Sequence, residues 1–236
     1  QWQKLLLGSE RPGGRVNPTS TRRWLRKSFS ANMPYDQFVS ELITAEGNTE
    51  ENPAVNFLLR HELKPLETAA RISGLFMGLP LECAQCHDHP YESWTQRDFY
   101  GMAAFFAQVT PDRSANQRMM RDIRKKREQG IRGARPVVTI RESKVGDLTL
   151  DYGSGDEIIR PRFLGGRRLD ASDDGIRRRV FAGMLKDPQY PYLSSTIVNR
   201  IWAHFLGSGL VKPLDGLIPS NPASHPRLLE WLARDF

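Results

Sequence analysis

The stretch Glu82-Cys83-Ala84-Gln85-Cys86-His87-Asp88-His89-Pro90 contains both cysteines of the chain, in a C-x-x-C-H arrangement. Two cysteines three residues apart on one helical turn present their sulfurs to the two vinyl groups along one edge of a porphyrin. The next residue, His87, then directs its imidazole at the iron. This spacing predicts one covalently attached haem c, with Cys83 and Cys86 as the attachment points and His87 as the proximal iron ligand.

Three other interpretations of the motif compete with haem. A structural zinc site needs a second pair of ligands, and the chain has no second pair of cysteines. A thioredoxin-like dithiol needs a βαβ context, whereas helical patterns flank the motif on both sides. A disulfide between Cys83 and Cys86 is the third. The residues favour haem, and a structural or binding module that holds zinc or a disulfide stays as an alternative.

The motif leaves the sixth ligand of the iron open. His89 follows His87 too closely to reach the opposite face of the same haem, so a hydrogen bond that orients the loop or the proximal imidazole suits it better. The other candidates for the sixth position are Met77, Met102, His61, His204 and His225. Each is better explained as a core methionine or a hydrogen-bonded histidine than as a ligand. The candidates for pairing with haem propionates are Arg71, Arg97 and Arg200.

Helical patterns precede the motif. Thr19 or Ser20 is placed to cap a helix through Trp24 and Leu25. Apolar residues in 34–43 recur at helical spacing after Pro34, and Gly47 is expected to end that helix. Another helix is expected from Pro65 to Gly78.

After the motif, Thr95 and Asp98 have the spacing of a capping box ahead of an aromatic-rich helix over 99–109. The runs 137–140 and 148–150 favour a β hairpin or small sheet across Lys144-Val-Gly-Asp147, followed by Ile158 and Phe163. Further helices are expected after the cap at 172–175, over 194–205, and from Ser224 onward, with Gly207 ending the second of them.

These elements predict a mainly α fold: a helical haem domain with a small β hairpin or sheet insertion and a C-terminal helical segment. We expect three parts, namely the haem domain over 1–112, a basic helix and hairpin connector over 113–168, and a helical segment over 169–236. With 39% hydrophobic and 26% charged residues, the composition is that of an ordinary globular protein. No apolar run approaches the roughly 18 residues that span a bilayer.

The two ends of the sequence suggest a fragment. The chain starts at Gln1 rather than Met and has no export signal before its first helical pattern, and it stops while an apolar helical face is still being laid down at Phe236. We therefore expect that a signal peptide is not included in this stretch.

The net charge of +7 is concentrated in one segment. Residues 118–135 hold eight basic and two acidic residues, which favours a solvated helix followed by a glycine-containing loop. The same charge would suit docking of an acidic partner or a polyanion. Nucleic acid is not expected as the partner, because the segment has no aromatic side chain to stack on a base.

The motif and its flanks resemble a known family. The stretch 76–91, then Trp94, Asp98-Phe-Tyr100 and Ala104-Phe-Phe106, is similar to the planctomycete cytochrome domain PSCyt2 (DUF1549), and the similarity begins near Arg22. The stretches 199–211 and 222–233 are similar to the start of the partner domain PSD1 (DUF1553), and they place His204 and His225 at family positions. The resemblance implies a periplasmic or secreted bacterial protein with a single c-type haem, without an established reaction.

We therefore expect an electron-transfer module that works with an unidentified redox partner protein. The alternative is a haem-dependent oxidoreductase in which an open sixth position admits a small or carbohydrate-type substrate, with His204, His225 or His89 moving protons.

Overall fold

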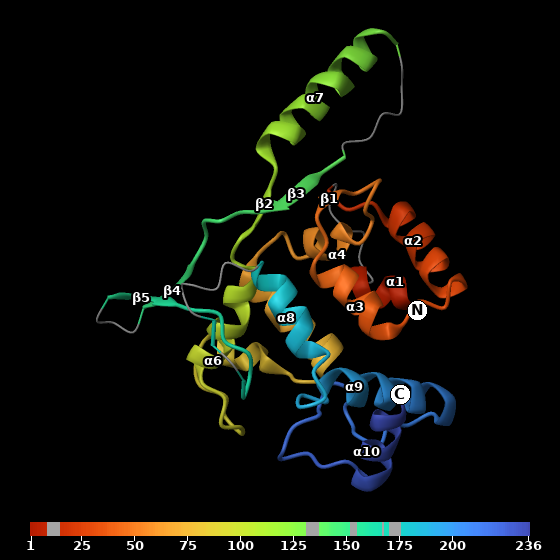
Figure 1. Ribbon diagram of the computed structural model, residues 1–236, viewed down its shortest axis with the longest axis vertical. Coiled ribbons are helices and arrows are strands. Elements are labelled where there is room, and N and C mark those ends of the chain that lie inside the picture. The colour runs from red at the N-terminus through yellow and green to blue at the C-terminus, as the bar shows by residue number, and fades with distance from the viewer. Residues whose placement is uncertain (9–14, 131–136, 152–154, 167, 170–175) are drawn as a thin grey trace. The chain divides into compact units, whose positions relative to one another are not determined.

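The computed structural model describes residues 1–8, 15–130, 137–151, 155–166, 168–169 and 176–236 (Figure 1). The chain divides into two compact units, each built from two separate stretches of sequence. The first unit comprises 1–63 and 108–146, and the second comprises 64–107 and 147–236. The described residues are mainly helical with small antiparallel sheets, which confirms the predicted fold class.

The first unit combines short helices with a three-stranded antiparallel sheet. Its helices are α1 (Trp2–Leu7), α2 (Pro18–Ser30), α3 (Tyr35–Ile43), α4 (Val55–Arg60) and α7 (Arg113–Glu128). The sheet has the order β1 (Gly47–Asn48), β3 (Thr139–Glu142), β2 (Val109–Pro111). The aromatic ring of Phe38 is buried among those of Trp2, Trp24 and Phe29, with centroid separations of 5.4, 5.1 and 5.7 Å.

Two expectations for this unit were wrong in detail. Helix α2 is capped by Asn17, whose side chain accepts hydrogen bonds from the backbone of both Thr19 and Ser20, rather than by either of those residues. Asn17 holds this position because its own N–H donates to the buried side chain of Asn56, at 2.7 Å. Helix α3 ends at Ile43, before the expected stop at Gly47, which begins strand β1 instead. The short helix α4 was not predicted.

The expected strand pairing was also wrong. Strand β3 pairs with β1 on one edge and with β2 on the other, so both of its edges are occupied. It therefore does not form a hairpin with the strand that follows it. That strand, β4 (Leu148–Asp151), pairs with β5 (Asp156–Ile159) in a separate two-stranded sheet.

Helix α7 begins at a carboxylate cap. The pKa of Asp112 lies below its ordinary value, first because the Ala115 N–H donates to its carboxylate and second because the Ser114 hydroxyl does so. The folded pKa is thus lower than the unfolded one, so the cap stabilises the helix fully above the ordinary pKa and less as the pH falls through the folded pKa.

We expect the first turn of α7 to fray as the pH falls below about 4, since an ordinary Asp titrates near 3.9 and the pKa of Asp112 lies lower. Amide exchange of Ala115, followed by NMR, measures this fraying. In Asp112→Asn the side-chain oxygen still accepts but does not titrate. The protection of the Ala115 amide, relative to an unfolded amide at the same pH, should then no longer fall on acidification. An equal acid response in both proteins would contradict a role for the Asp112 charge.

The second unit contains the cysteine motif. Its α-helices are α5 (Pro65–Ile72), α6 (Gln96–Ala103), α8 (Arg177–Leu185), α9 (Tyr192–Leu206) and α10 (Pro226–Asp235). Shorter turns are the π-helical η1 (Ser73–Met77) and the 3-10 helices η2 (Leu81–Gln85) and η3 (Ala104–Phe106). The capping box at Thr95 and Asp98 is confirmed, as are the left-handed glycines that end η1 and α9, Gly78 and Gly207. The expected cap at 172–175 lies outside the described residues.

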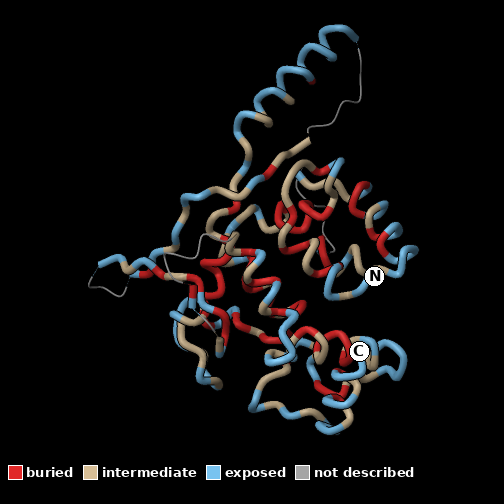
Figure 2. The backbone as a smooth tube through the Cα atoms, in the orientation of Figure 1, coloured by how far each residue is buried: buried red, intermediate tan, exposed pale blue. Residues whose placement is uncertain are grey.

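One aromatic cluster joins the two stretches of the second unit. Phe181 of α8 is fully buried, and its ring lies edge-on to those of Phe105, Phe106 and Phe163 at centroid distances of 5.2, 5.2 and 5.3 Å. Residues before 107 and after 147 therefore share one core (Figure 2, where the buried backbone is red). The division of the chain into parts 1–112, 113–168 and 169–236 stays a prediction.

A smaller core holds α10 against α9. Val198, Leu210, Val211 and Leu229 are buried together. The side chain of Asn199 is buried beside them, donating to the Val211 carbonyl and accepting from the Val211 N–H, both at 3.0 Å. This amide satisfies a backbone that leaves the helix at Gly207, and so it fixes the chain segment that leads to α10.

Candidate cofactor-attachment site

The cysteines lie at a 3-10 turn rather than on an α-helix. Cys83 is inside η2 and Cys86 is its C-cap residue, with φ −110° and ψ −25°. In a 3-10 helix residues i and i+3 lie on the same side, because one turn takes three residues. Leu81 and Ala84 form the buried side of η2, whereas Cys83 and Cys86 are both exposed and free. One side of the turn is therefore buried, and the other side carries two accessible thiols.

The imidazole of His87 is held in a defined tautomer. Its Nδ1 lies 2.7 Å from the carbonyl oxygen of Asp88. A carbonyl can only accept, so Nδ1 must carry the proton and donate it. In the neutral ring Nε2 then has a free lone pair. This is the state that a metal-binding histidine adopts when its other nitrogen is fixed by a backbone carbonyl.

His89 has the opposite arrangement. Its Nδ1 accepts hydrogen bonds from the backbone N–H groups of Tyr91, at 3.3 Å, and Glu92, at 3.1 Å. Its own backbone N–H donates to the Trp94 carbonyl at 2.8 Å, and its ring lies edge-on to the Trp94 indole. Because Nδ1 accepts, the proton of the neutral ring is on Nε2. His89 therefore organises the loop after the motif, and its free ring nitrogen is protonated rather than available to iron.

Removing the His89 acceptor is expected to loosen this loop. His89→Leu should speed amide exchange of Tyr91 and Glu92 by roughly three- to tenfold, since one such hydrogen bond is worth about 0.5–1.5 kcal/mol. Hydrogen exchange followed by NMR is the measurement. His89→Asn is the matched control, because its side-chain oxygen can accept where Nδ1 did, and it should restore most of the protection. Equal exchange in all three proteins would contradict the assigned contact.

Further contacts fasten the loop to its surroundings. The Asp88 carboxylate accepts from the Gln96 N–H at 2.8 Å, at the N-terminus of α6. The Gln96 side chain donates to the Gln85 carbonyl at 3.0 Å. The Glu92 carboxylate accepts from the N–H of Ser220, at 3.1 Å, and from its hydroxyl. Sequence reasoning did not predict these contacts of Asp88, Gln96 and Glu92. An acidic residue shortly before a capping box is a usable signal for Asp88, whereas nothing in the sequence connects Glu92 with Ser220.

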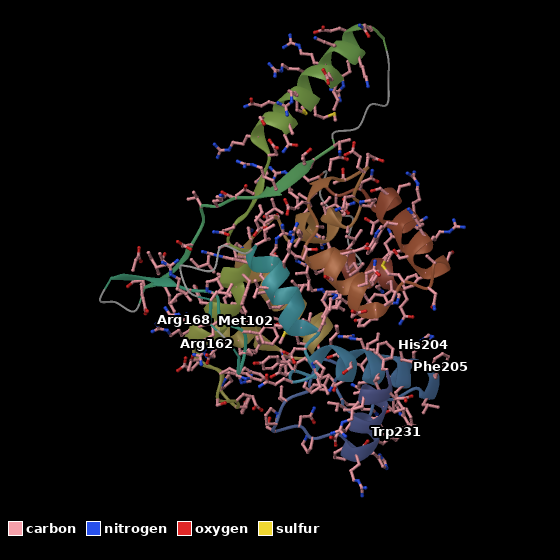
Figure 3. The ribbon with its side chains drawn as sticks, viewed as in Figure 1. Met102, Arg162, Arg168, His204, Phe205 and Trp231 are labelled. Carbon is pink, nitrogen blue, oxygen red and sulfur yellow. The ribbon has the colours of Figure 1, made fainter. Side chains whose placement is uncertain are left out.

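The predicted sixth-ligand residues lie in different environments. Met102 is buried in the core on α6, at 1% exposure, and Met77 is buried on η1 (Figure 3 labels Met102). His204 is exposed on α9 with its ring 5.3 Å from that of Phe205, and His225 is exposed at the N-cap of α10. His61 belongs to the first unit. Each of these five side chains remains a prediction as a ligand.

The predicted propionate partners have structural contacts. Arg200 of α9 donates to the Gly74 carbonyl at 3.1 Å, which ties α9 to η1 just before the motif. Arg97 forms an ion pair with Glu157 across α6 and β5. Arg71 lies half-buried on α5. Arg200 therefore positions the helix that leads into the motif, and its pairing with a propionate stays a prediction.

The groups present at the motif are those that haem attachment uses. Within the described ranges no three or more His, Cys, Asp and Glu side chains come close enough together to hold a metal ion. Two free, accessible thiols three residues apart and an imidazole with a free Nε2 are the groups that haem attachment requires.

No described helix is long and apolar enough to cross a membrane.

Two family models match the chain. Residues 4–111 match PSCyt2, described as a protein of unknown function (DUF1549), and residues 177–236 match PSD1, also described as a protein of unknown function (DUF1553). The name PSCyt2 refers to a planctomycete cytochrome domain, but the function of the family is unknown. Searches of curated proteins and of solved structures found no match. The chain therefore contains a PSCyt2 (DUF1549) domain at residues 4–111 and a PSD1 (DUF1553) domain at residues 177–236.

Proposed function

We propose that the chain is an extracytoplasmic c-type cytochrome module that carries one haem and exchanges electrons with a redox partner protein. The observation that carries the proposal is the donor arrangement at η2. Two exposed thiols lie on one side of a 3-10 turn, and the following imidazole is hydrogen-bonded so that Nε2 is free. The match of residues 4–111 to PSCyt2, whose name refers to a planctomycete cytochrome, supports the same assignment.

The chain's own residues have distinct tasks in this proposal. When bound, haem supplies one-electron redox chemistry at its iron. Cys83 and Cys86 hold it covalently, and His87 binds through Nε2. The Asp88 carbonyl accepts the Nδ1 proton, which fixes the ring orientation and makes Nε2 a stronger electron donor. His89, Asp88 and Glu92 keep the loop after the motif in one conformation.

The proposed compartment is the bacterial periplasm or the cell exterior. Two exposed thiols close together in sequence are prone to oxidation in such a compartment unless they are consumed by a cofactor. Thioether attachment removes both of them. The family resemblance supports the same location.

The test is whether the mature protein carries a covalent macrocycle. The full chain is exported in a bacterium that expresses the c-type haem maturation machinery, and the purified product is analysed by pyridine haemochrome spectrum and intact mass. We expect a spectrum typical of haem with two thioether bonds and a mass increased by one haem. A colourless product of unmodified mass, obtained while a known cytochrome c matures in the same cells, would falsify the proposal and favour the zinc or disulfide module.

A second measurement separates electron transfer from catalysis. If a protein side chain occupies the sixth position, cyanide should change the ferric spectrum only slowly, because the iron is already six-coordinate. An immediate spectral change would instead favour the haem-dependent oxidoreductase acting on a small or carbohydrate-type substrate.

A further inference from the structure

The N-terminal end of helix α7 is held in the first unit by hydrogen bonds. Asp112 caps it, and the Asn116 side chain binds both the N–H and the carbonyl of Thr139 on β3, at 2.8 and 3.0 Å. From this end the helix runs outward from strands β2 and β3 of its own unit (Figure 1), and most of it is exposed (Figure 2). Ile123 is its buried residue.

Helix stability explains only part of the charge of α7. Arg113–Glu128 carries seven cationic and two acidic side chains, a net +5. Cations near a helix C-terminus stabilise it, which accounts for Lys125, Lys126 and Arg127. Arg113 occupies the first helical position, where the helix dipole disfavours a cation, and Arg121 lies too far from the C-terminus to gain from the dipole. An anion that binds these two side chains would offset that cost.

Those two arginines border an apolar hollow. We name it the α7 hollow; its volume is about 510 Å³, and it is lined by Pro111, Arg113, Asn116, Gln117, Met120 and Arg121. Met120 is 56% exposed there, a large apolar side chain that the fold leaves open to solvent. The side chains thus offer an apolar floor with a guanidinium on its border at Arg113 and another at Arg121.

We propose that the α7 hollow binds an acidic segment of a partner protein, with one large apolar side chain against Met120 and Pro111 and neighbouring carboxylates on Arg113 and Arg121. Guanidinium groups pair well with carboxylates, and methionine adapts its shape to varied apolar partners. An acidic sequence with an apolar anchor satisfies both parts of the surface at once. This proposal is independent of haem attachment.

Other anionic partners fit the same surface less well. Arg113–Glu128 has no aromatic residue on which a base could stack, which disfavours single-stranded nucleic acid. A helix that lies in a membrane interface needs a broad exposed apolar face. On α7 Ile123 is buried and Met119 half-buried, which leaves Met120 as its large exposed apolar side chain.

The test uses fluorescence anisotropy with the full chain and a labelled peptide of aspartates and glutamates around one central phenylalanine. Arg113→Gln combined with Arg121→Gln should weaken binding about tenfold, from the loss of two ion pairs. Lys126→Gln combined with Arg127→Gln is the matched control: it removes the same charge from the same helix outside the hollow, and we expect about threefold weakening or less, through long-range charge alone. Circular dichroism checks that both variants stay folded.

Two further comparisons test the apolar part. Met120→Gln, or serine in place of the peptide's phenylalanine, should each weaken binding about tenfold through lost apolar burial. Equal weakening by the two double variants, or no effect of Met120→Gln, would overturn the proposal in favour of a diffuse polyanion surface. Tighter binding to vesicles of phosphatidylcholine and phosphatidylserine in equal parts, or to single-stranded DNA, than to the peptide would overturn it as well.

Discussion

Replacing Cys83 and Cys86 together by serine is expected to abolish covalent haem attachment. Each thioether bond requires one cysteine sulfur, and the chain has no other cysteine to supply one. Each single serine variant should yield little holoprotein. The measurement is the covalent haem content per chain, from intact mass and from haem staining of the denatured protein.

Ser93→Ala is the control for this prediction. Ser93 is exposed in the same loop and should leave the haem content unchanged. A double serine variant that still carries a covalent macrocycle would refute attachment through these sulfurs.

His87→Ala tests the iron ligand separately from attachment. The thioether bonds can still form in this variant, whereas the native spectrum should be lost because Nε2 no longer binds the iron. Added imidazole should then restore a spectrum close to the native one, since it replaces the missing ligand. A normal spectrum in His87→Ala without imidazole would rule out His87 as the proximal ligand.

Phe181→Ala is expected to be strongly destabilising, by about 3–5 kcal/mol in the free energy of unfolding. The Phe181 ring is fully buried against Phe105, Phe106 and Phe163, and its removal leaves a cavity that the surrounding rings cannot fill. Urea unfolding followed by circular dichroism measures the change. The Cys83→Ser, Cys86→Ser background removes any contribution of haem binding to the measured stability.

The matched control is Phe205→Ala on α9. Figure 3 labels Phe205. Its side chain is 77% exposed, so its removal should change the free energy of unfolding by about 0.5 kcal/mol or less. Similar losses in both variants would show that the ring cluster around Phe181 is not a core. The result also bears on the families, because Phe181 lies in the PSD1 match and Phe105 in the PSCyt2 match.

Local features were well predicted from the sequence. The capping box at Thr95 needs only two side chains three residues apart, and Gly78 and Gly207 end helices because a left-handed backbone is easy for glycine. The C-x-x-C-H motif was recognised for the same reason. Its chemistry requires three groups within five consecutive residues, so sequence spacing alone brings them together.

Contacts between distant residues were not predictable in this way. Nothing in the sequence shows that β3 has both edges occupied, that Asn56 holds the α2 cap at Asn17, or that Glu92 binds Ser220. The tautomers of His87 and His89, which leave Nε2 unprotonated in one ring and protonated in the other, depend on backbone groups placed by the fold. The roles of Met102, His204 and Arg200 toward haem stay predictions.

The sequence by itself determined the mainly helical class, the capping box at Thr95, the helix ends at Gly78 and Gly207 and the C-x-x-C-H motif of this protein, because these depend on residues within one or two turns of each other. Tertiary structure alone decided the strand pairing, the shared core around Phe181 and the hydrogen bonds that hold the loop after His87. These depend on which distant surfaces bury each other's apolar side chains and satisfy each other's polar groups. A local sequence pattern does not specify which distant residues come into contact.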